Sequence, residues 1–120
     1  KRLNISENPI ESLNHIDKLT QLTDLNLSRL SLDSIPESVF NTEKLEMLNL
    51  QGNQIRQLPP AISRLKHLKI LNLNRNKLNS LPVEIEQLTQ LKSLQIEGMG
   101  FEKTYVQALQ KKLPNTKIKY

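Results

Sequence analysis

Apolar residues recur every 23 positions along most of this chain, and this period limits the folds open to it more than any other feature. One register holds Leu25, Leu48, Leu71 and Leu94. A second register, two residues later, holds Leu27, Leu50, Leu73 and Ile96. A third, three residues before the first, holds Leu22, Leu45, Leu68 and Leu91. A single copy cannot bury its own apolar side chains, whereas stacked copies can. The sequence therefore predicts a solenoid built from one repeated unit.

Each copy combines two apolar periods. Around Leu48 and Leu50, apolar and polar residues alternate, as in a short strand with one buried face. After the Leu-Pro pair at 58–59, apolar residues recur three or four apart, as on one side of a short helix or 3₁₀ segment. Asn53 lies between the two, where its amide can bond backbone groups that a bend leaves unpaired. We therefore expect parallel strands joined by short helical arms.

The copies read L-x-x-L-x-L-x-x-N-x-L-x-x-L-P-x-x-I-x-x-L. This pattern resembles the leucine-rich repeat family in its 23-residue Leu-Pro form, which occurs in Ras-suppressor-like scaffolds and in many bacterial repeat proteins. The resemblance covers about residues 2–101. It implies an α/β solenoid, a short right-handed horseshoe with a parallel β-sheet on the concave face and helical or 3₁₀ arms on the convex face. It also implies a protein or peptide ligand in the concavity.

Several residues depart from the pattern. Leu30 and Met99 stand where the repeat places Asn. We expect Leu30 to pack locally while water or a neighbouring group bonds the backbone. Thr42 replaces a Leu of the arm, and we expect Phe40 beside it to fill the space.

The period stops after residue 101, and residues 102–120 are expected to form a C-terminal cap. A helix is predicted over Thr104–Leu113 with Thr104 as its N-cap. The final TKIKY is predicted as a short edge strand or an extended tail, with Ile118 buried and its lysines outward, which discourages further pairing. Residues 1–101 then hold about four to five repeats.

The first copy has nothing before it to cover its strand, so we expect the chain to be the C-terminal part of a longer array, with a flanking partner that covers the strand as the alternative. We expect a monomer, with a dimer through the uncapped N-terminal end as the alternative.

Composition and motifs narrow the classes of function that we expect for the chain. The chain has no Cys, its two histidines occupy polar repeat positions, and it contains neither G-x-S-x-G nor a P-loop. We expect no enzymatic activity, cofactor or metal. No apolar run approaches the roughly 18 residues of a spanning helix.

The net charge is +5, and residues 101–120 account for +4 of it. A basic excess confined to the tail, with 3% aromatic residues, argues against nucleic acid as the partner. The tail lysines either complement a helix dipole or bind a phosphate or a membrane surface.

The polar side of the predicted strands holds the candidate binding residues. Met47 and Ile70 are adjacent apolar residues there, among polar ones, which is typical of a contact site. The neighbouring Asn column either forms amide ladders that stabilise the sheet or faces a ligand. The predicted partner-binding residues are Asp24, Asn26, Arg29, Met47, Asn49, Gln51, Ile70, Asn72, Asn74, Arg75 and Gln95.

Three functions remain open from the sequence. The first is a recognition module that binds a protein or peptide on the concave face. The second is a structural or scaffold segment of a multidomain protein, with no ligand of its own. The third is a targeting part of a protein whose catalytic domain lies upstream of residue 1.

Overall fold

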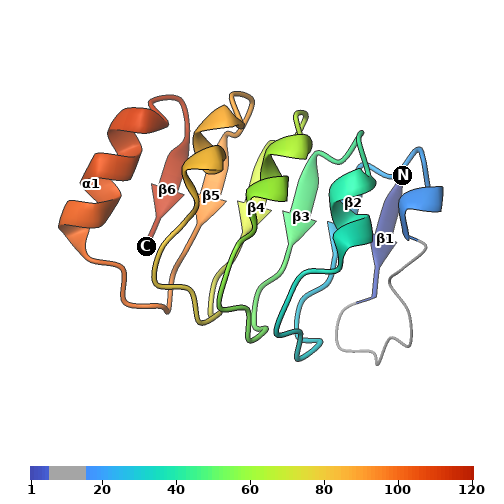
Figure 1. Cartoon of the computed structure of the whole chain (residues 1–120), viewed down its shortest axis with the longest axis horizontal. Helices are drawn as coiled ribbons and strands as arrows, with labels where there is room; N and C mark the ends of the chain where they lie inside the picture. The colour runs from blue at the N-terminus through green and yellow to red at the C-terminus, as the bar shows by residue number, and fades with distance from the viewer. Residues whose placement is uncertain (6–15) are drawn as a thin grey trace.

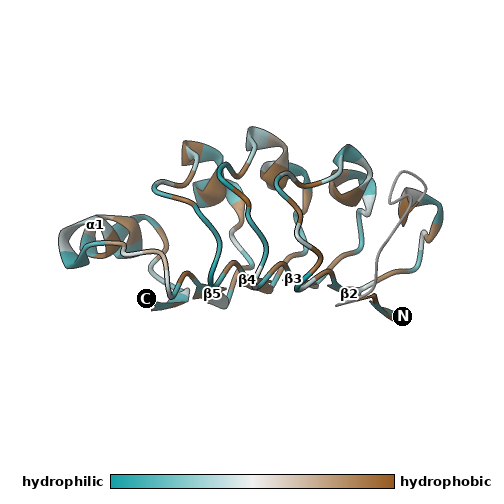
Figure 2. Cartoon of the chain, turned by 90° about the horizontal axis from the view of Figure 1, so that it is seen from below, coloured by the Kyte–Doolittle hydropathy of each residue, from teal (hydrophilic) through white to brown (hydrophobic). Residues whose placement is uncertain are grey.

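The computed structural model describes residues 1–5 and 16–120. Parallel strands form a single sheet along one side of the molecule, and short helical arms cover its other side (Figures 1 and 2). The molecule measures 39 × 25 × 20 Å. The sheet runs in chain order through β1 (Arg2–Asn4), β2 (Asp24–Asn26), β3 (Met47–Asn49), β4 (Ile70–Asn72), β5 (Ser93–Gln95) and β6 (Lys117–Lys119). This is the solenoid that the sequence predicts, with an open sheet that does not close on itself.

The 23-residue period sets the strand register. Leu25, Leu48, Leu71 and Leu94 are paired partners in β2 to β5, and each is fully buried. The ladder continues past the strands, where the N–H of Leu50 donates to the Asn72 carbonyl at 2.8 Å. Because neighbouring strands are parallel, the chain must cross back over the sheet between one strand and the next. The arms make that crossing.

The arms are 3₁₀ helices in the repeats and an α-helix at the C-terminal end. They are η1 (Ile16–Lys18), η2 (Glu37–Asn41), η3 (Pro60–Arg64), η4 (Val83–Gln87) and α1 (Lys103–Lys112). A proline, Pro36, Pro59 or Pro82, occupies the N-cap of η2, η3 and η4. Proline has no N–H to leave unpaired and its φ is fixed, so it defines where each arm begins.

The core lies between the sheet and the arms. Phe40 is 1% exposed and Thr42 beside it 3%, so both are buried, and Phe40 occupies the core as expected. The Thr42 hydroxyl donates to the Val39 carbonyl at the end of η2, which satisfies the one polar group that replaces leucine there.

Asn53 and Asn76 bond the backbone across neighbouring repeats. Asn53 Nδ2 donates to the carbonyls of Leu27 and Leu50, at 2.9 Å each. Asn53 Oδ1 accepts from the N–H groups of Leu30 and Leu32, at 3.0 and 2.9 Å. A neighbour therefore bonds the backbone at Leu30, as expected. The corresponding residue of the first copy, Asn8, lies outside the described residues.

The C-terminal segment corrects two expectations. Thr104 is not the N-cap of the helix: α1 begins at Lys103, with Glu102 at its N-cap and no side-chain capping bond. Glu102 has an extended backbone and its carbonyl accepts the Val106 N–H at 3.1 Å, so the helix starts one residue earlier. Ile118 is half-buried rather than buried, because β6 is the last strand of the sheet.

Candidate functional site

The side of the sheet that faces away from the arms (Figure 1) is called the concave face here. The strand register places its side chains in columns that run across the strands. The register gives a first column of Arg2, Asp24, Met47, Ile70, Ser93 and Lys117. It gives a second column of Asn4, Asn26, Asn49, Asn72, Gln95 and Lys119. Of the eleven predicted site residues, seven lie in these columns; Arg29, Gln51, Asn74 and Arg75 follow the strands at the same side. Ser6 and Glu7 are the corresponding residues after the first strand, and they lie outside the described residues.

Two apolar side chains lie next to each other on this polar face. Met47 and Ile70 are paired residues of β3 and β4. Met47 is half-buried, and Ile70 is 40% exposed, one of three exposed large apolar residues in the described part of the chain. The strand neighbours Leu48 and Leu71 point into the core, so alternation places Met47 and Ile70 outward.

The amides of the second column bond their own backbone. The Oδ1 atoms of Asn26, Asn49 and Asn72 each accept the N–H two residues ahead, at 3.0 Å. These bonds run along the chain, unlike those of an amide ladder, which run from strand to strand. They fix the orientation of each amide and hold the bend at the end of each strand.

Further side-chain bonds cross between repeats at the strand ends. Asn72 Nδ2 donates to Gln51 Oε1 at 2.9 Å, and Asn74 Nδ2 donates to Gln95 Oε1 and Glu97 Oε1 at 3.3 Å. Asn74 Oδ1 in turn accepts the Glu97 N–H at 2.7 Å. Much of the amide capacity of this face is therefore used within the protein, which keeps the surface ordered.

Arginine and glycine alternate in the row that follows the strands. Arg29, Gly52, Arg75 and Gly98 all have positive φ, at 57°, 71°, 58° and 80°. Both arginines are exposed at one edge of the concave face. Arg75 forms no ion pair with any part of the chain that the structure describes.

Sequence reasoning missed two members of the columns. Lys117 and Lys119 pair with Ser93 and Gln95, so β6 extends the first and second columns with two exposed ammonium groups. The signal available in the sequence was the alternation around Ile118. The other tail lysines differ: Lys111 and Lys112 lie in the last turn of α1, where they complement its dipole, and Lys112 approaches Glu86 at 3.5 Å.

An ion pair lies at the rim where the arms lead into the strands. Lys69 Nζ is 2.8 Å from Glu46 Oε1, and both side chains are largely exposed. The hydrogen bond and charge of Lys69 lower the pKa of Glu46 below its usual value of 4.5. Lys69 directly precedes Ile70, so its charge beside the apolar pair is already compensated.

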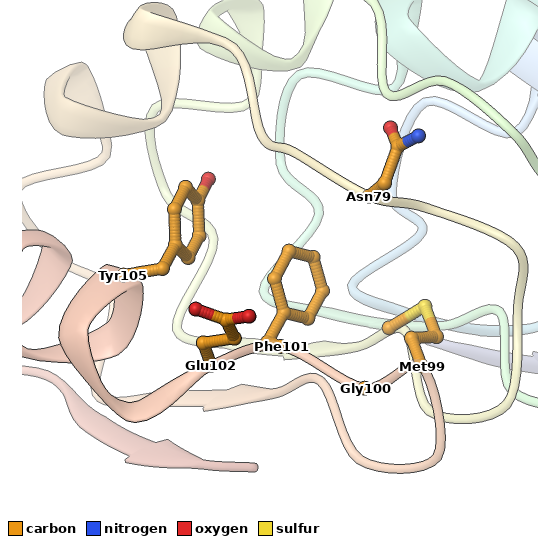
Figure 3. Close-up of a pocket in the computed structure, with 6 residues that line it drawn as sticks. All are labelled: Asn79, Met99, Gly100, Phe101, Glu102 and Tyr105. Atoms are coloured by element: carbon orange, nitrogen blue, oxygen red, sulfur yellow. The ribbon is translucent and has the colours of Figure 1, made fainter.

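A hollow of about 300 Å³ lies beside α1, away from the concave columns. Figure 3 shows Asn79, Met99, Phe101, Glu102 and Tyr105 around it. The rings of Phe101 and Tyr105 stack at 5.1 Å, and the Tyr105 hydroxyl accepts the Leu81 N–H at 2.8 Å. The side chains around the hollow thus join the last repeat to α1, and Glu102 is the one carboxylate among them.

No group of three or more His, Cys, Asp or Glu residues in residues 1–5 and 16–120 is placed to hold a metal ion. None of the helices described has the length and apolar character needed to cross a membrane.

Comparison with known proteins agrees with this geometry. A family model described as a leucine-rich repeat region matches residues 3–115. No curated protein matches the sequence significantly. A solved leucine-rich repeat protein of Leptospira interrogans is 32% identical, with a TM-score of 0.89, over 98% of this chain and 30% of that one. An internalin of Listeria monocytogenes is 29% identical, with a TM-score of 0.81, over 99% of this chain and 34% of that one.

A third solved structure shares the fold at lower identity. The leucine-rich repeat ectodomain of the Arabidopsis thaliana receptor kinase SOBIR1 is 24% identical, with a TM-score of 0.73, over 98% of this chain and 66% of that one. The chain spans about a third of the two bacterial structures. The repeat register, the parallel sheet and the family match agree, and the chain belongs to the leucine-rich repeat family.

Proposed function

We propose that this chain is a recognition module that binds a protein or peptide on its concave face. The observation that carries the proposal is the pair formed by Met47 and Ile70, which lie side by side on a face otherwise made of amides and charged groups. Apolar side chains surrounded by polar ones are typical of a protein interface, where a few central contacts dominate the binding free energy and the residues around them exclude water.

The surrounding surface supports the proposal because hydrogen bonds already hold its amide side chains in place. Amides that bond their own backbone do not have to be immobilised when a partner arrives, so less conformational entropy is lost on binding. The family match supports a protein-interaction role in general terms. The predicted site residues on β2 to β5 keep their proposed role as the contact surface.

Site-specific photo-crosslinking in a lysate of the source organism tests this function. A photoreactive amino acid replaces Asn49 on the concave face or, as the control position, exposed Gln87 in η4. We expect a distinct crosslinked protein from position 49 and none from position 87.

Two matched variants show whether the apolar pair is responsible. Met47→Arg with Ile70→Arg should abolish the crosslink. Val83→Arg should preserve it, because Val83 is an equally apolar residue, 66% exposed, in the arm η4 on the other side of the sheet. Crosslinking that persists in the double variant would contradict concave binding. A concave face that captures nothing would favour the scaffold segment instead.

A further inference from the structure

Positive side chains gather at the C-terminal end of the concave face. Lys117 and Lys119 extend the columns beyond Ser93 and Gln95. Lys92 lies directly before β5, at the rim in the same row as Glu46 and Lys69, and its carbonyl accepts the Lys117 N–H at 2.8 Å. All three lysines are exposed. We call Lys92, Lys117 and Lys119 the basic end.

These three charges are not compensated by ion pairs. Lys92, Lys117 and Lys119 form none with the described part of the chain, in contrast to Lys69, which pairs with Glu46 at 2.8 Å. One carboxylate, that of Glu97, follows β5, and it accepts the Asn74 amide at 3.3 Å. Three ammonium groups therefore exceed the negative charge around the last two strands.

The opposite end of the first column is different. Asp24 precedes Met47 in the column, and its carboxylate lies 3.2 Å from Arg2 Nε. This end offers a neutral ion pair rather than a free cation. The column therefore has a direction: an ion pair, then the apolar residues Met47 and Ile70, then the basic end.

The strand spacing gives the distance between the apolar pair and the basic end. Ile70 in β4 and Lys117 in β6 belong to one column and are two strands apart. Neighbouring strands lie about 4.8 Å apart, so the two positions are separated by about 10 Å. A peptide extended in the polyproline II conformation advances about 3.1 Å per residue with three residues per turn, so side chains three positions apart lie on the same side and about 9 Å apart.

We infer, on the basis of the function proposed above, that the concave face selects an extended peptide segment that carries an acidic residue about three positions from an apolar one. The apolar side chain contacts Met47 and Ile70, and the carboxylate binds the basic end. Charge complementarity fixes the direction of the segment across the strands, because a carboxylate at the other end would meet Asp24.

Selection from a phage library of random linear peptides tests the inference. The baits are the wild-type chain, a charge-reversal variant with Lys117→Glu and Lys119→Glu, and a control variant with Lys103→Glu and Lys111→Glu. The control makes the same change in net charge on exposed residues of α1. Circular dichroism establishes that each bait is folded. Lys92→Glu, which lies outside the strands, gives a second test should the β6 variant fail to fold.

We expect wild-type peptides to be enriched in Asp or Glu about three positions to one side of a large apolar residue. The control variant should select the same peptides, whereas the charge-reversal variant should lose the acidic enrichment. Replacing the acidic residue of a selected peptide by its amide should weaken binding about twofold to fivefold, and less at high salt.

The outcomes separate the two proposals. Peptides that require Met47 and Ile70 but show no acidic preference would overturn the inference and leave the proposed function standing. Acidic enrichment that survives in the charge-reversal variant would also overturn it. A wild-type chain that selects no peptides, or peptides that bind the Met47→Arg, Ile70→Arg variant equally well, would overturn both.

Discussion

Arg75 lies so close to Gly98 that a Cβ atom on the glycine would stand 3.0 Å from the Arg75 Cγ. Gly52 bears the same relation to Arg29, at 3.2 Å. In both pairs the arginine of one repeat lies against the glycine of the next. Glycine suits these positions for two reasons: it adopts a positive φ without the strain that a side chain brings, and it leaves space for the arginine stem.

Gly98→Ala should therefore lower stability more than Gly100→Ala. Gly100 also has a positive φ, of 76°, but nothing lies within 4 Å of its Cβ position. Its substitution should cost about 1–2 kcal/mol, the backbone term alone. Gly98→Ala adds the contact with Arg75, and urea denaturation should show the larger loss.

The double variant Arg75→Ala, Gly98→Ala shows how much of the stability lost in Gly98→Ala comes from the contact with Arg75. Without Cγ at position 75, the two substitutions should cost less together than the sum of the separate losses. Strict additivity would mean that the arginine stem moves aside at no cost, and that only the backbone requires glycine.

The strands and their register could be predicted from the sequence because the alternation within each strand agrees with the repeat period. Leu48 and Leu50 must face the core, and a period of 23 residues places their counterparts beside them. The rule fails at the last strand, because Lys117 lies 24 residues after its partner Ser93 and α1 replaces the short arm. The 23-residue period therefore assigns no partners to Lys117 and Lys119, although the alternation around Ile118 predicts that both point outward.

The candidate site could be predicted in position but not in its hydrogen bonding. Alternation places Asn49 and Asn72 outward, whichever partner the amide takes. Both amides bond their own backbone and Asn72 also bonds Gln51 of the neighbouring repeat, and these partners depend on the bend after the strand, which composition does not reveal. The start of α1 was missed for a similar reason, since it depends on the backbone angles of Glu102.

Asn53→Ala should destabilise the chain by about 2–4 kcal/mol, because buried backbone groups in two repeats lose their partner. Urea denaturation followed by circular dichroism measures the loss. Asn79→Ala is a suitable control, because Asn79 is exposed and should change stability little. Equal losses at the two positions would contradict the role assigned to Asn53.

The pKa of Glu46 should rise toward 4.5 when Lys69 is replaced by Gln, since Lys69 is the main cause of its depression. A carboxyl group with a lowered folded-state pKa contributes stability above its unfolded pKa and loses it as pH falls through the folded value. The difference in stability between wild type and Lys69→Gln should thus be greatest near neutral pH and fade below pH 4.5. NMR titration of the Glu46 carboxyl carbon checks the shift, and high salt should reduce it. An unchanged titration would exclude the ion pair in solution.

Ile70→Ala and Leu71→Ala should differ sharply although the two residues are adjacent in β4. Leu71 is fully buried between the sheet and the arms, so its truncation leaves a cavity and should cost about 2–5 kcal/mol. Ile70 is 40% exposed, and its truncation should cost well under half as much. Chemical denaturation of both variants measures the contrast. In the crosslinking assay the order should reverse: Ile70→Ala, which stays folded, should lose partner capture, and Leu71→Ala should retain it in whatever fraction is folded. Equal destabilisation by the two variants would mean that Ile70 is packed inside the protein, and the concave apolar pair would then have no role in recognition.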